Sequence, residues 1–237
     1  MRRLLTRLAA RQKAADAFPG SRAYWDARYA QGGNSGAGSY NRLAKFKAQY
    51  LNDFVSKNGV GSVIEFGCGD GAQLGLALYP QYFGVDVSQT AVLRCRQAFA
   101  SDPTKRFDIV PPEGETFDLS LSLDVIYHLV EDDVYERYME QLIAVSRSWI
   151  IVFASNFAQA EAADRAPGST ADHVRHRRFS DWMETHAVGW TLVEHVPNPY
   201  PWKQDQPTET TFADFYLYRL SSGAALVERR APRSAST

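Results

Sequence analysis

Short apolar runs alternate with amphipathic stretches along the middle of this chain. The apolar runs predict strands, because a strand buried in a parallel sheet reads as a nearly continuous hydrophobic segment. We expect strands at residues 63–66, 82–87, 106–110, 117–123, 149–154, 190–196 and 212–220. Apolar positions at helical spacing predict helices at residues 21–29, 41–55, 73–79, 89–100, 132–146 and 179–187. This alternation, without an internal repeat, indicates one doubly wound α/β sheet.

Stretches of biased composition set the expected boundaries. Residues 1–21 form a basic leader, interpreted as a solvated amphipathic segment, with membrane-surface contact or partner docking as the alternatives. Residues 22–57 form an N-terminal helical and lid segment, in which the glycine-rich stretch 32–39 is either a linker or a lid that orders over a ligand. Residues 58–220 form the main domain, and residues 221–237 a disordered tail.

Composition narrows the class of protein. With 237 residues, 45% of them hydrophobic, the chain is long enough for one globular domain with a substantial core. A net charge of -1 disfavours a nucleic-acid partner. The two cysteines, Cys68 and Cys95, do not suggest a disulfide framework, so we expect a reducing cytoplasm. No apolar run is long enough for a transmembrane segment. The oligomeric state stays open, a homodimer included.

The candidate chemistry centres on Glu65-x-Gly67-x-Gly69-x-Gly71, at the end of the first predicted strand. Glycines let the backbone turn tightly and approach a ligand closely. Asp86 ends the second predicted strand, where a carboxylate can accept the hydroxyls of a ribose. An acid, alternating glycines and a second acid in this order resemble the class I S-adenosylmethionine-dependent methyltransferases over residues 62–154.

That resemblance implies a fold and a cofactor site. The fold is a Rossmann-like, mostly parallel seven-stranded sheet with an antiparallel C-terminal strand and an N-terminal helical lid. The cofactor is S-adenosylmethionine, converted to S-adenosylhomocysteine. Its methionine part would meet the backbone of Gly67, Cys68 and Gly69, its ribose Asp86, and its adenine Asp108. The remaining cofactor-binding residues implied are Glu65, Gly71, Val87, Leu123 and Asp124. Asp108 as a turn cap and Cys68 as packing are the structural alternatives.

A hydroxyl acceptor must lose a proton during methyl transfer, so the enzyme needs a general base or a metal. His128, just beyond the fourth predicted strand, is the leading candidate base. The alternatives are that His128 caps the following helix or pairs with Glu131 or Asp132. Asn156, after the fifth strand, would orient the imidazole or bind substrate.

A second cluster runs from His173 to Arg178. Arg175 is its best donor for an acidic or hydroxylated group, and His173 and His176 are alternative bases. The same residues also suit a solvated turn. Asp172 forms a weak pattern for a metal site together with His173 and His176, so a divalent metal is not excluded, although none is predicted. The predicted substrate-binding aromatic residues are Tyr24, Trp25, Tyr127, Tyr200 and Trp202, and core packing is the alternative for each of them.

Residues 32–39, 124–129 and 173–178 resemble, less specifically, a bacterial subgroup found with polysaccharide-modifying enzymes, including methyltransferases of mycobacterial mannosides. This resemblance implies O-methylation of a saccharide hydroxyl, with His128 as the base. N-methylation of a small amine and a cofactor-binding partner without activity are the alternatives. A nucleic-acid methylase is disfavoured, because residues 123–126 read Leu-Asp-Val-Ile where adenine methylases carry Asn-Pro-Pro-Tyr.

Overall fold

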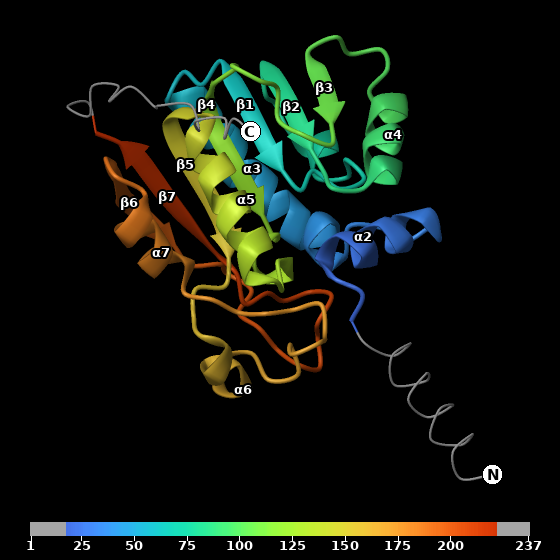
Figure 1. The fold of residues 1–237 in the computed structure, drawn as a ribbon, viewed down its shortest axis with the longest axis vertical. Helices are drawn as coiled ribbons and strands as arrows, with labels where there is room; N and C mark the ends of the chain where they lie inside the picture. Colours follow the sequence, from blue (N-terminus) through green and yellow to red (C-terminus); the bar gives the residue numbers. More distant parts are fainter. Residues whose placement is uncertain (1–17, 222–237) are drawn as a thin grey trace, which may run out of the picture.

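The predicted strands form one seven-stranded sheet (Figure 1). The computed structural model describes residues 18–221. The strand order is β3-β2-β1-β4-β5-β7-β6; the first five are parallel, and β7 runs antiparallel to β5 and β6. The strands are β1 (Ser62–Phe66), β2 (Gln81–Val85), β3 (Lys105–Asp108), β4 (Phe117–Leu123), β5 (Ser146–Ala154), β6 (Trp190–Val196) and β7 (Asp214–Leu220). The predicted doubly wound sheet with an antiparallel C-terminal strand is confirmed.

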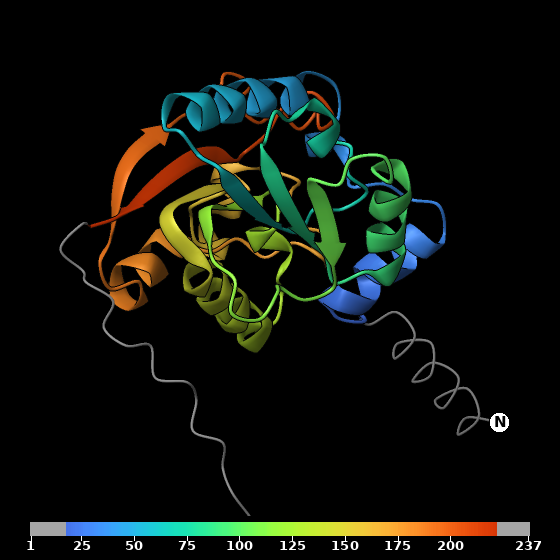
Figure 2. The ribbon, with the colours of Figure 1, turned by 90° about the horizontal axis from the view of Figure 1, so that it is seen from above.

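Helices cover both faces of the sheet, as Figure 2 shows from above. Helices α3 and α4 pack on one face, and α5 and α7 on the other. The helices are α2 (Ser21–Ala30), α3 (Asn41–Lys57), α4 (Gln89–Ala98), α5 (Asp132–Ala144), α6 (Ala162–Arg165) and α7 (Phe179–His186). Short 3-10 segments are η1 (Ala37–Ser39), η2 (Leu74–Leu76), η3 (Ile126–His128) and η4 (Gln159–Glu161).

Successive side chains of a central strand enter different cores, because a strand alternates its side chains between faces. In β1, Val63 packs in the core beneath α3 and α4, whereas Ile64 and Phe66 pack in the core beneath α5 and α7. Burial on both faces explains why this strand reads as an apolar run.

The helix predicted at residues 73–79 is wrong, because the chain forms only η2 there. Gly75 weakens a helix in its middle, and Pro80 disfavours helical geometry at the residue before it. The segment instead folds into turns, with Gly75 N–H donating to Gly71 O at 3.0 Å. Leu76 and Leu78 are left exposed as a result.

Ser88 caps the start of α4. The Ser88 hydroxyl accepts a hydrogen bond from the Ala91 N–H at 3.4 Å, which satisfies one free donor of the first turn. The same hydroxyl donates to Asp26 of α2 at 2.7 Å. One serine thus caps α4 and ties the N-terminal helix to the end of β2.

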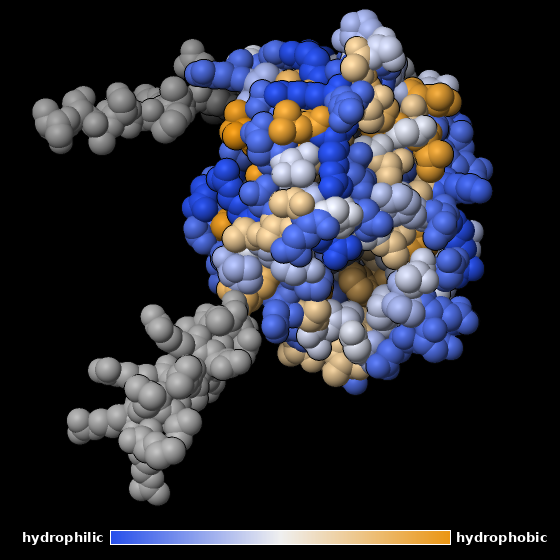
Figure 3. Space-filling model, turned by 90° about the vertical axis from the view of Figure 1, so that its right-hand side faces the viewer, coloured by the Kyte–Doolittle hydropathy of each residue, from blue (hydrophilic) through white to orange (hydrophobic). Residues whose placement is uncertain are grey.

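The face that carries α2, α4 and β3 is mostly hydrophilic, with apolar residues in separate groups (Figure 3). Scattered apolar residues of this kind are ordinary on a protein surface. The predicted leader lies outside the described residues except for 18–21, of which Ser21 already begins α2, and the predicted tail lies outside them except for Ser221. Among residues 18–221, no helix is both long and apolar enough to cross a membrane.

Candidate active site

The glycine turn follows β1 and folds back on the end of β2. Gly67, Gly69 and Gly71 have φ angles of 80°, 57° and 79°, which side-chain-bearing residues rarely adopt. The N–H groups of Gly67 and Cys68 both donate to Val85 O, at 2.7 and 3.0 Å. A Cβ atom on Gly69 would lie 2.1 Å from the Ser35 hydroxyl oxygen. The turn therefore needs glycine for both its conformation and its close contacts.

Asp86 lies against this turn. It follows β2 directly, and its buried carboxylate accepts hydrogen bonds from the N–H groups of Gly69 and Ser88, both at 2.9 Å. Burial raises the pKa of Asp86 to about 6, and the nearby Asp70 and Asp26 add to the rise. Each carboxylate oxygen keeps a second lone pair for a ligand hydroxyl.

Glu65 lies in β1, beneath the turn. Burial raises the pKa of Glu65 to about 7, although the Tyr82 hydroxyl donates a hydrogen bond to it at 2.7 Å. Together with Asp86 and Asp70, Glu65 makes this end of the sheet acidic, and a cation bound there would relieve the repulsion.

The glycine-rich loop between α2 and α3 lies on the turn. Ser35 donates to Asp70 through its N–H at 3.0 Å and through its hydroxyl at 2.8 Å, and the Tyr40 hydroxyl donates to the same carboxylate at 2.7 Å. In return, Asp70 N–H donates to the Ser35 hydroxyl at 2.9 Å. Tyr29 is buried beside this contact, with its hydroxyl 3.0 Å from that of Ser35. These bonds fasten residues 32–39, the predicted lid, to Asp70.

Asp124, at the end of β4, forms a buried ion pair. Lys47 of α3 has only 1% of its side chain exposed, and its ammonium lies 2.6 Å from the Asp124 carboxylate. The Tyr127 hydroxyl donates to the same carboxylate at 2.8 Å. Asp124 has a φ of 60°, a left-handed conformation that costs a non-glycine residue about 1 kcal/mol or more. The ion pair and this hydrogen bond hold the side chain in place.

His128 is held by a backbone carbonyl. Its Nδ1 lies 3.0 Å from His173 O, and a carbonyl only accepts, so Nδ1 carries the proton and Nε2 is left as the basic nitrogen. The imidazole stacks on His173 and meets the edge of Trp25 at a centroid distance of 4.9 Å. Burial lowers the pKa of His128 to about 4, so the ring is neutral at pH 7.

A cavity of about 300 Å³ opens between the lid, the end of β4 and the loops that follow β5 and β6. Aromatic rings and hydroxyl groups make up much of its wall. Its lining residues include Trp25, Ser35, Asp124, Tyr127, His128, Ser169, His173, Trp202, Thr210, Thr211 and Phe212. Gly67, Gly69 and Asp86 do not line this cavity; their end of the sheet lies under the lid.

Solved structures that are similar to this chain include methyltransferases. N-methyltransferase NodS from Bradyrhizobium japonicum WM9, in complex with S-adenosyl-L-homocysteine, is 18% identical with a TM-score of 0.56, over 75% of this chain and 87% of that one. Magnesium protoporphyrin IX methyltransferase from Synechocystis PCC 6803, with the same bound product, is 15% identical with a TM-score of 0.56, over 76% and 85% of the two chains. At these identities the likeness shows the fold.

The family model described as a methyltransferase domain matches residues 64–147, which include the glycine turn, Asp86 and Asp124. The protein is an S-adenosylmethionine-dependent methyltransferase. No curated protein matches the chain.

The residues present fit this cofactor, which carries a positive sulfonium and an ammonium group. Acidic groups gather at the glycine turn, and burial raises the pKa values of two of them, Asp86 and Glu65. A cationic ligand would favour their ionised forms. The turn presents bare backbone at Gly67 and Gly69, because neither residue has a side chain.

The other residues expected to bind the cofactor lie around the same strand ends. Asp108 is the last residue of β3, and Arg96 of α4 pairs with its carboxylate at 3.1 Å. Val87 is 44% exposed, whereas Leu123 and Cys68 are buried. A hydrogen bond with Cys95 and burial raise the pKa of the Cys68 thiol well above its ordinary value, which fits packing and not nucleophilic chemistry.

Four of the predicted substrate residues do not line the cavity. Asn156 exchanges hydrogen bonds with Ser180 at the start of α7, and Tyr200 lies beneath the Arg42 guanidinium, 4.5 Å from ring centroid to Cζ. Tyr24 stacks on His173 at 4.5 Å and supports the wall from behind. Trp25, Tyr127 and Trp202, by contrast, do line it.

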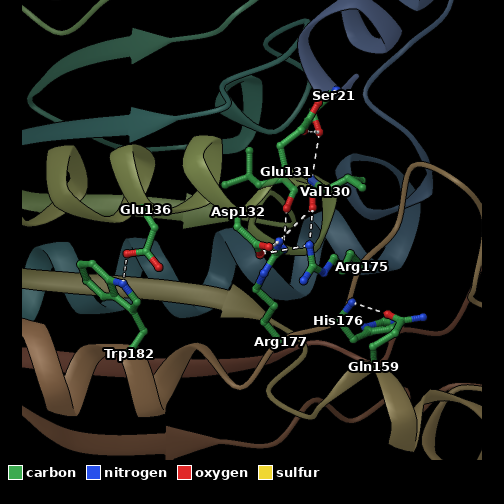
Figure 4. Close-up of polar contacts among 11 residues, drawn as sticks. Ser21, Val130, Glu131, Asp132, Glu136, Gln159, Arg175, His176, Arg177 and Trp182 are labelled. Carbon is green, nitrogen blue, oxygen red and sulfur yellow. Dashed lines mark hydrogen bonds and ion pairs between the residues drawn. The ribbon is translucent and has the colours of Figure 1, made fainter. Parts of the chain in front are cut away.

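Arg175, the fourth, holds the loop before α5 (Figure 4). Its Nη1 donates to Val130 O at 2.9 Å and pairs with Asp132 at 3.0 Å. Arg177 contacts the same two residues. Glu131 accepts hydrogen bonds from the N–H and hydroxyl of Ser21, at 2.8 and 2.6 Å. Glu131 and Asp132 thus pair with other residues, and His128 bonds to the His173 carbonyl instead of pairing with either carboxylate.

The predicted alternative bases differ in position. His173 lines the cavity, and burial lowers its pKa. His176 is 1% exposed and lies between two serine hydroxyls. Among residues 18–221, His, Cys, Asp and Glu side chains form no group of three or more that could hold a metal ion.

Sequence reasoning missed Lys47 and the lid latch. Lys47 had a visible signal: it lies four residues after Leu43 and four before Leu51, on the apolar face of α3. A lysine in such a stripe indicates a buried partner. Ser35 and Asp70 had no comparable signal, since their contact joins residues 35 positions apart.

Proposed function

We propose that this methyltransferase methylates a hydroxyl group of a saccharide or glycoside, with His128 as the general base. The cavity beside His128 carries the argument. Its lining residues include the aromatic residues Trp25, Tyr127 and Trp202 and several residues with hydroxyl groups. Aromatic faces pack against the C–H groups of a sugar ring, while polar side chains bind its hydroxyls.

When bound, S-adenosylmethionine supplies an electrophilic methyl group on its sulfonium. The chain's own residues then have two tasks. The backbone of the glycine turn, Asp86, Asp108, Leu123 and Asp124 hold the cofactor, and the lid at residues 32–39 closes over it and excludes water. His128 takes the proton of the acceptor hydroxyl at Nε2, while its Nδ1–H stays bound to His173 O.

Replacing His128 tests this assignment. We expect His128→Gln to lower kcat about 100-fold or more, the usual contribution of a general base, and to leave the Kd of S-adenosylmethionine unchanged. His186→Gln is a matched control, because His186 is exposed on α7 and its Nδ1 is likewise 3.0 Å from a carbonyl, that of Trp182. The assay measures methyl transfer to a panel of mono- and oligosaccharides, and full activity of His128→Gln would reject the assignment.

N-methylation of a small amine is the second candidate. Burial lowers the pKa of His128 to about 4, which makes it a weak base, and a neutral amine needs no strong base. One structurally similar protein is an N-methyltransferase by name. An N-methylated product, and no methylated saccharide, from a mixed panel would favour this candidate.

A further inference from the structure

A buried chain of three side chains leads from the end of β5 to the cavity. His176 lies in its middle: its Nδ1 is 2.8 Å from the Ser155 hydroxyl, and its Nε2 is 2.9 Å from the Ser169 hydroxyl. Ser155 is 1% exposed and follows β5 directly, whereas Ser169 lines the cavity. The chain thus joins the sheet to the wall that faces the acceptor.

Rings and a backbone contact fix the imidazole of His176. It stacks on Phe157 at a centroid distance of 4.5 Å, and it meets Phe212 edge-on at 4.9 Å. Its backbone N–H donates to the Gln159 side chain at 2.7 Å, as Figure 4 shows. Burial lowers the pKa of His176 to about 4. At pH 7 the ring is therefore neutral, with one donor nitrogen and one acceptor nitrogen.

The partners of the Ser155 hydroxyl determine which nitrogen of His176 carries the proton. The Ser155 hydroxyl has no other side-chain partner among residues 18–221, and it is buried. If Nδ1 donated to Ser155, the serine proton would lack an acceptor, at a cost of about 1–3 kcal/mol. Ser155 therefore donates to Nδ1, and Nε2–H donates to Ser169.

With its oxygen occupied by Nε2–H, Ser169 keeps its own proton for another acceptor. No protein atom within residues 18–221 accepts it. Ser35 and Thr210, which also line the cavity, already donate to Asp70 and to Gln206 O. Ser169 is thus a hydroxyl donor with a fixed oxygen, at the wall of the cavity.

We propose that Ser169 binds the acceptor by donating a hydrogen bond to one of its oxygen atoms, with His176 and Ser155 as positioning residues. The acceptor would then carry a second oxygen besides the one that is methylated, as a polyhydroxylated compound does. This inference rests on the proposed function, because it assigns the cavity to the acceptor. The Ser169 hydroxyl would favour an acceptor that has an oxygen lone pair at this position over an analogue that has only a C–H group there.

Kinetics with deoxy analogues test the contact. The probes are methyl α-mannoside, methyl α-glucoside and their monodeoxy analogues. We expect Ser169→Ala to raise the acceptor KM about tenfold, the value of one hydrogen bond, with the Kd of S-adenosylmethionine unchanged. For one of the deoxy analogues, the KM of the wild type should rise by the same factor, because the oxygen that Ser169 contacts is missing. The KM of Ser169→Ala should not rise further with that analogue. Ser101→Ala, at an exposed serine after α4, is the control. An unchanged KM with equal losses in both proteins would overturn the inference.

A second measurement needs no acceptor and separates this inference from the proposed function. Nitrogen-15 NMR of the histidines should show His176 in the Nε2–H tautomer, with the signal identified by its loss in His176→Asn. Ser155→Ala should shift this signal, because it removes the donor to Nδ1; a protonated Nδ1 in the wild type would overturn the inference. If only an amine is methylated and its KM still rises in Ser169→Ala, the proposed function fails and the contact at Ser169 stands.

Discussion

The folded chain disfavours the charged form of Asp86, and a bound cofactor should favour it. Burial raises its pKa to about 6, with Asp70 and Asp26 nearby. Asp86 is thus largely protonated at pH 5 and ionised above pH 7. Only the ionised form accepts from ribose hydroxyls with both oxygens and attracts a cation.

We therefore expect the affinity for S-adenosylmethionine to fall about tenfold between pH 7 and pH 5, since pH 5 lies about one unit below the pKa. Calorimetric titration at both pH values measures this change. Asp86→Asn should bind weakly at both and show little pH dependence. Equal affinity of the wild type at both pH values would contradict the role of Asp86.

Lys47 and Asp124 depend on each other at the same end of the sheet. Removing one partner of a buried pair leaves an uncompensated charge, which typically costs about 3–5 kcal/mol. We expect Lys47→Met to lower the free energy of unfolding by about 3 kcal/mol in urea denaturation, because Asp124 keeps the Tyr127 hydroxyl and some exposure. Lys45→Met, two residues away on the exposed face of α3, should change it by less than about 0.5 kcal/mol. Similar values for the two variants would show that the pair contributes nothing.

At the scale of elements, the lid joins α2 and α3 and is held by a few polar contacts to Asp70. Glycines at 32, 33, 36 and 38 give this loop little regular structure of its own. Asp70 contributes to its order by accepting hydrogen bonds from Ser35 and Tyr40, and Arg28 and Arg94 donate to the carbonyls of Asn34 and Gly33. Although burial opposes it, the hydrogen bonds that Asp70 accepts hold the pKa of Asp70 below its usual value.

Weakening this latch should open the lid without unfolding the domain. We expect Ser35→Ala to speed amide hydrogen exchange in residues 32–39 about fivefold to tenfold, the value of one hydrogen bond. Ser39→Ala, in the same loop, should leave the exchange unchanged, since its side chain makes no hydrogen bond within residues 18–221. Equal protection in wild type and Ser35→Ala would mean that the latch does not hold the lid.

At the scale of the whole molecule, buried groups with opposite shifts determine how stability depends on pH. Burial lowers the pKa of His128 and of His176 to about 4, so the unfolded chain binds their protons first, and stability falls as pH decreases from about 6.5 to 4. Asp86 and Glu65 have raised pKa values, so the folded chain binds their protons first. Stability therefore rises from this source as pH decreases from about 7 to 4. The two effects oppose each other in the wild type.

The contribution of His128 to this pH dependence can be measured by comparing the wild type with His128→Gln. We expect the free energy of unfolding of the wild type, relative to His128→Gln, to decrease by about 2 kcal/mol between pH 7 and pH 5, because each pH unit between the two pKa values is about 1.4 kcal/mol. Urea denaturation of both proteins at both pH values gives this difference. An unchanged difference would show that His128 titrates alike in the folded and unfolded chains.

Local sequence by itself determined the strands, most helices and the glycine turn. These features depend on residues close together in the sequence. Examples are the apolar run at residues 149–154, the serine cap at Ser88, and the alternating glycines at residues 67–71. The helix expected at residues 73–79 failed because Gly75 and Pro80 outweigh its apolar positions.

Only the tertiary structure decided which polar residues meet. Lys47 pairs with Asp124, Ser35 with Asp70, and His176 with Ser155 and Ser169, through contacts mostly between distant segments. In the fold, Arg175 and Asn156 hold a loop and a helix and do not line the cavity beside His128. The physical reason is that a buried polar group must find a partner wherever the fold brings one, and local sequence does not specify that position.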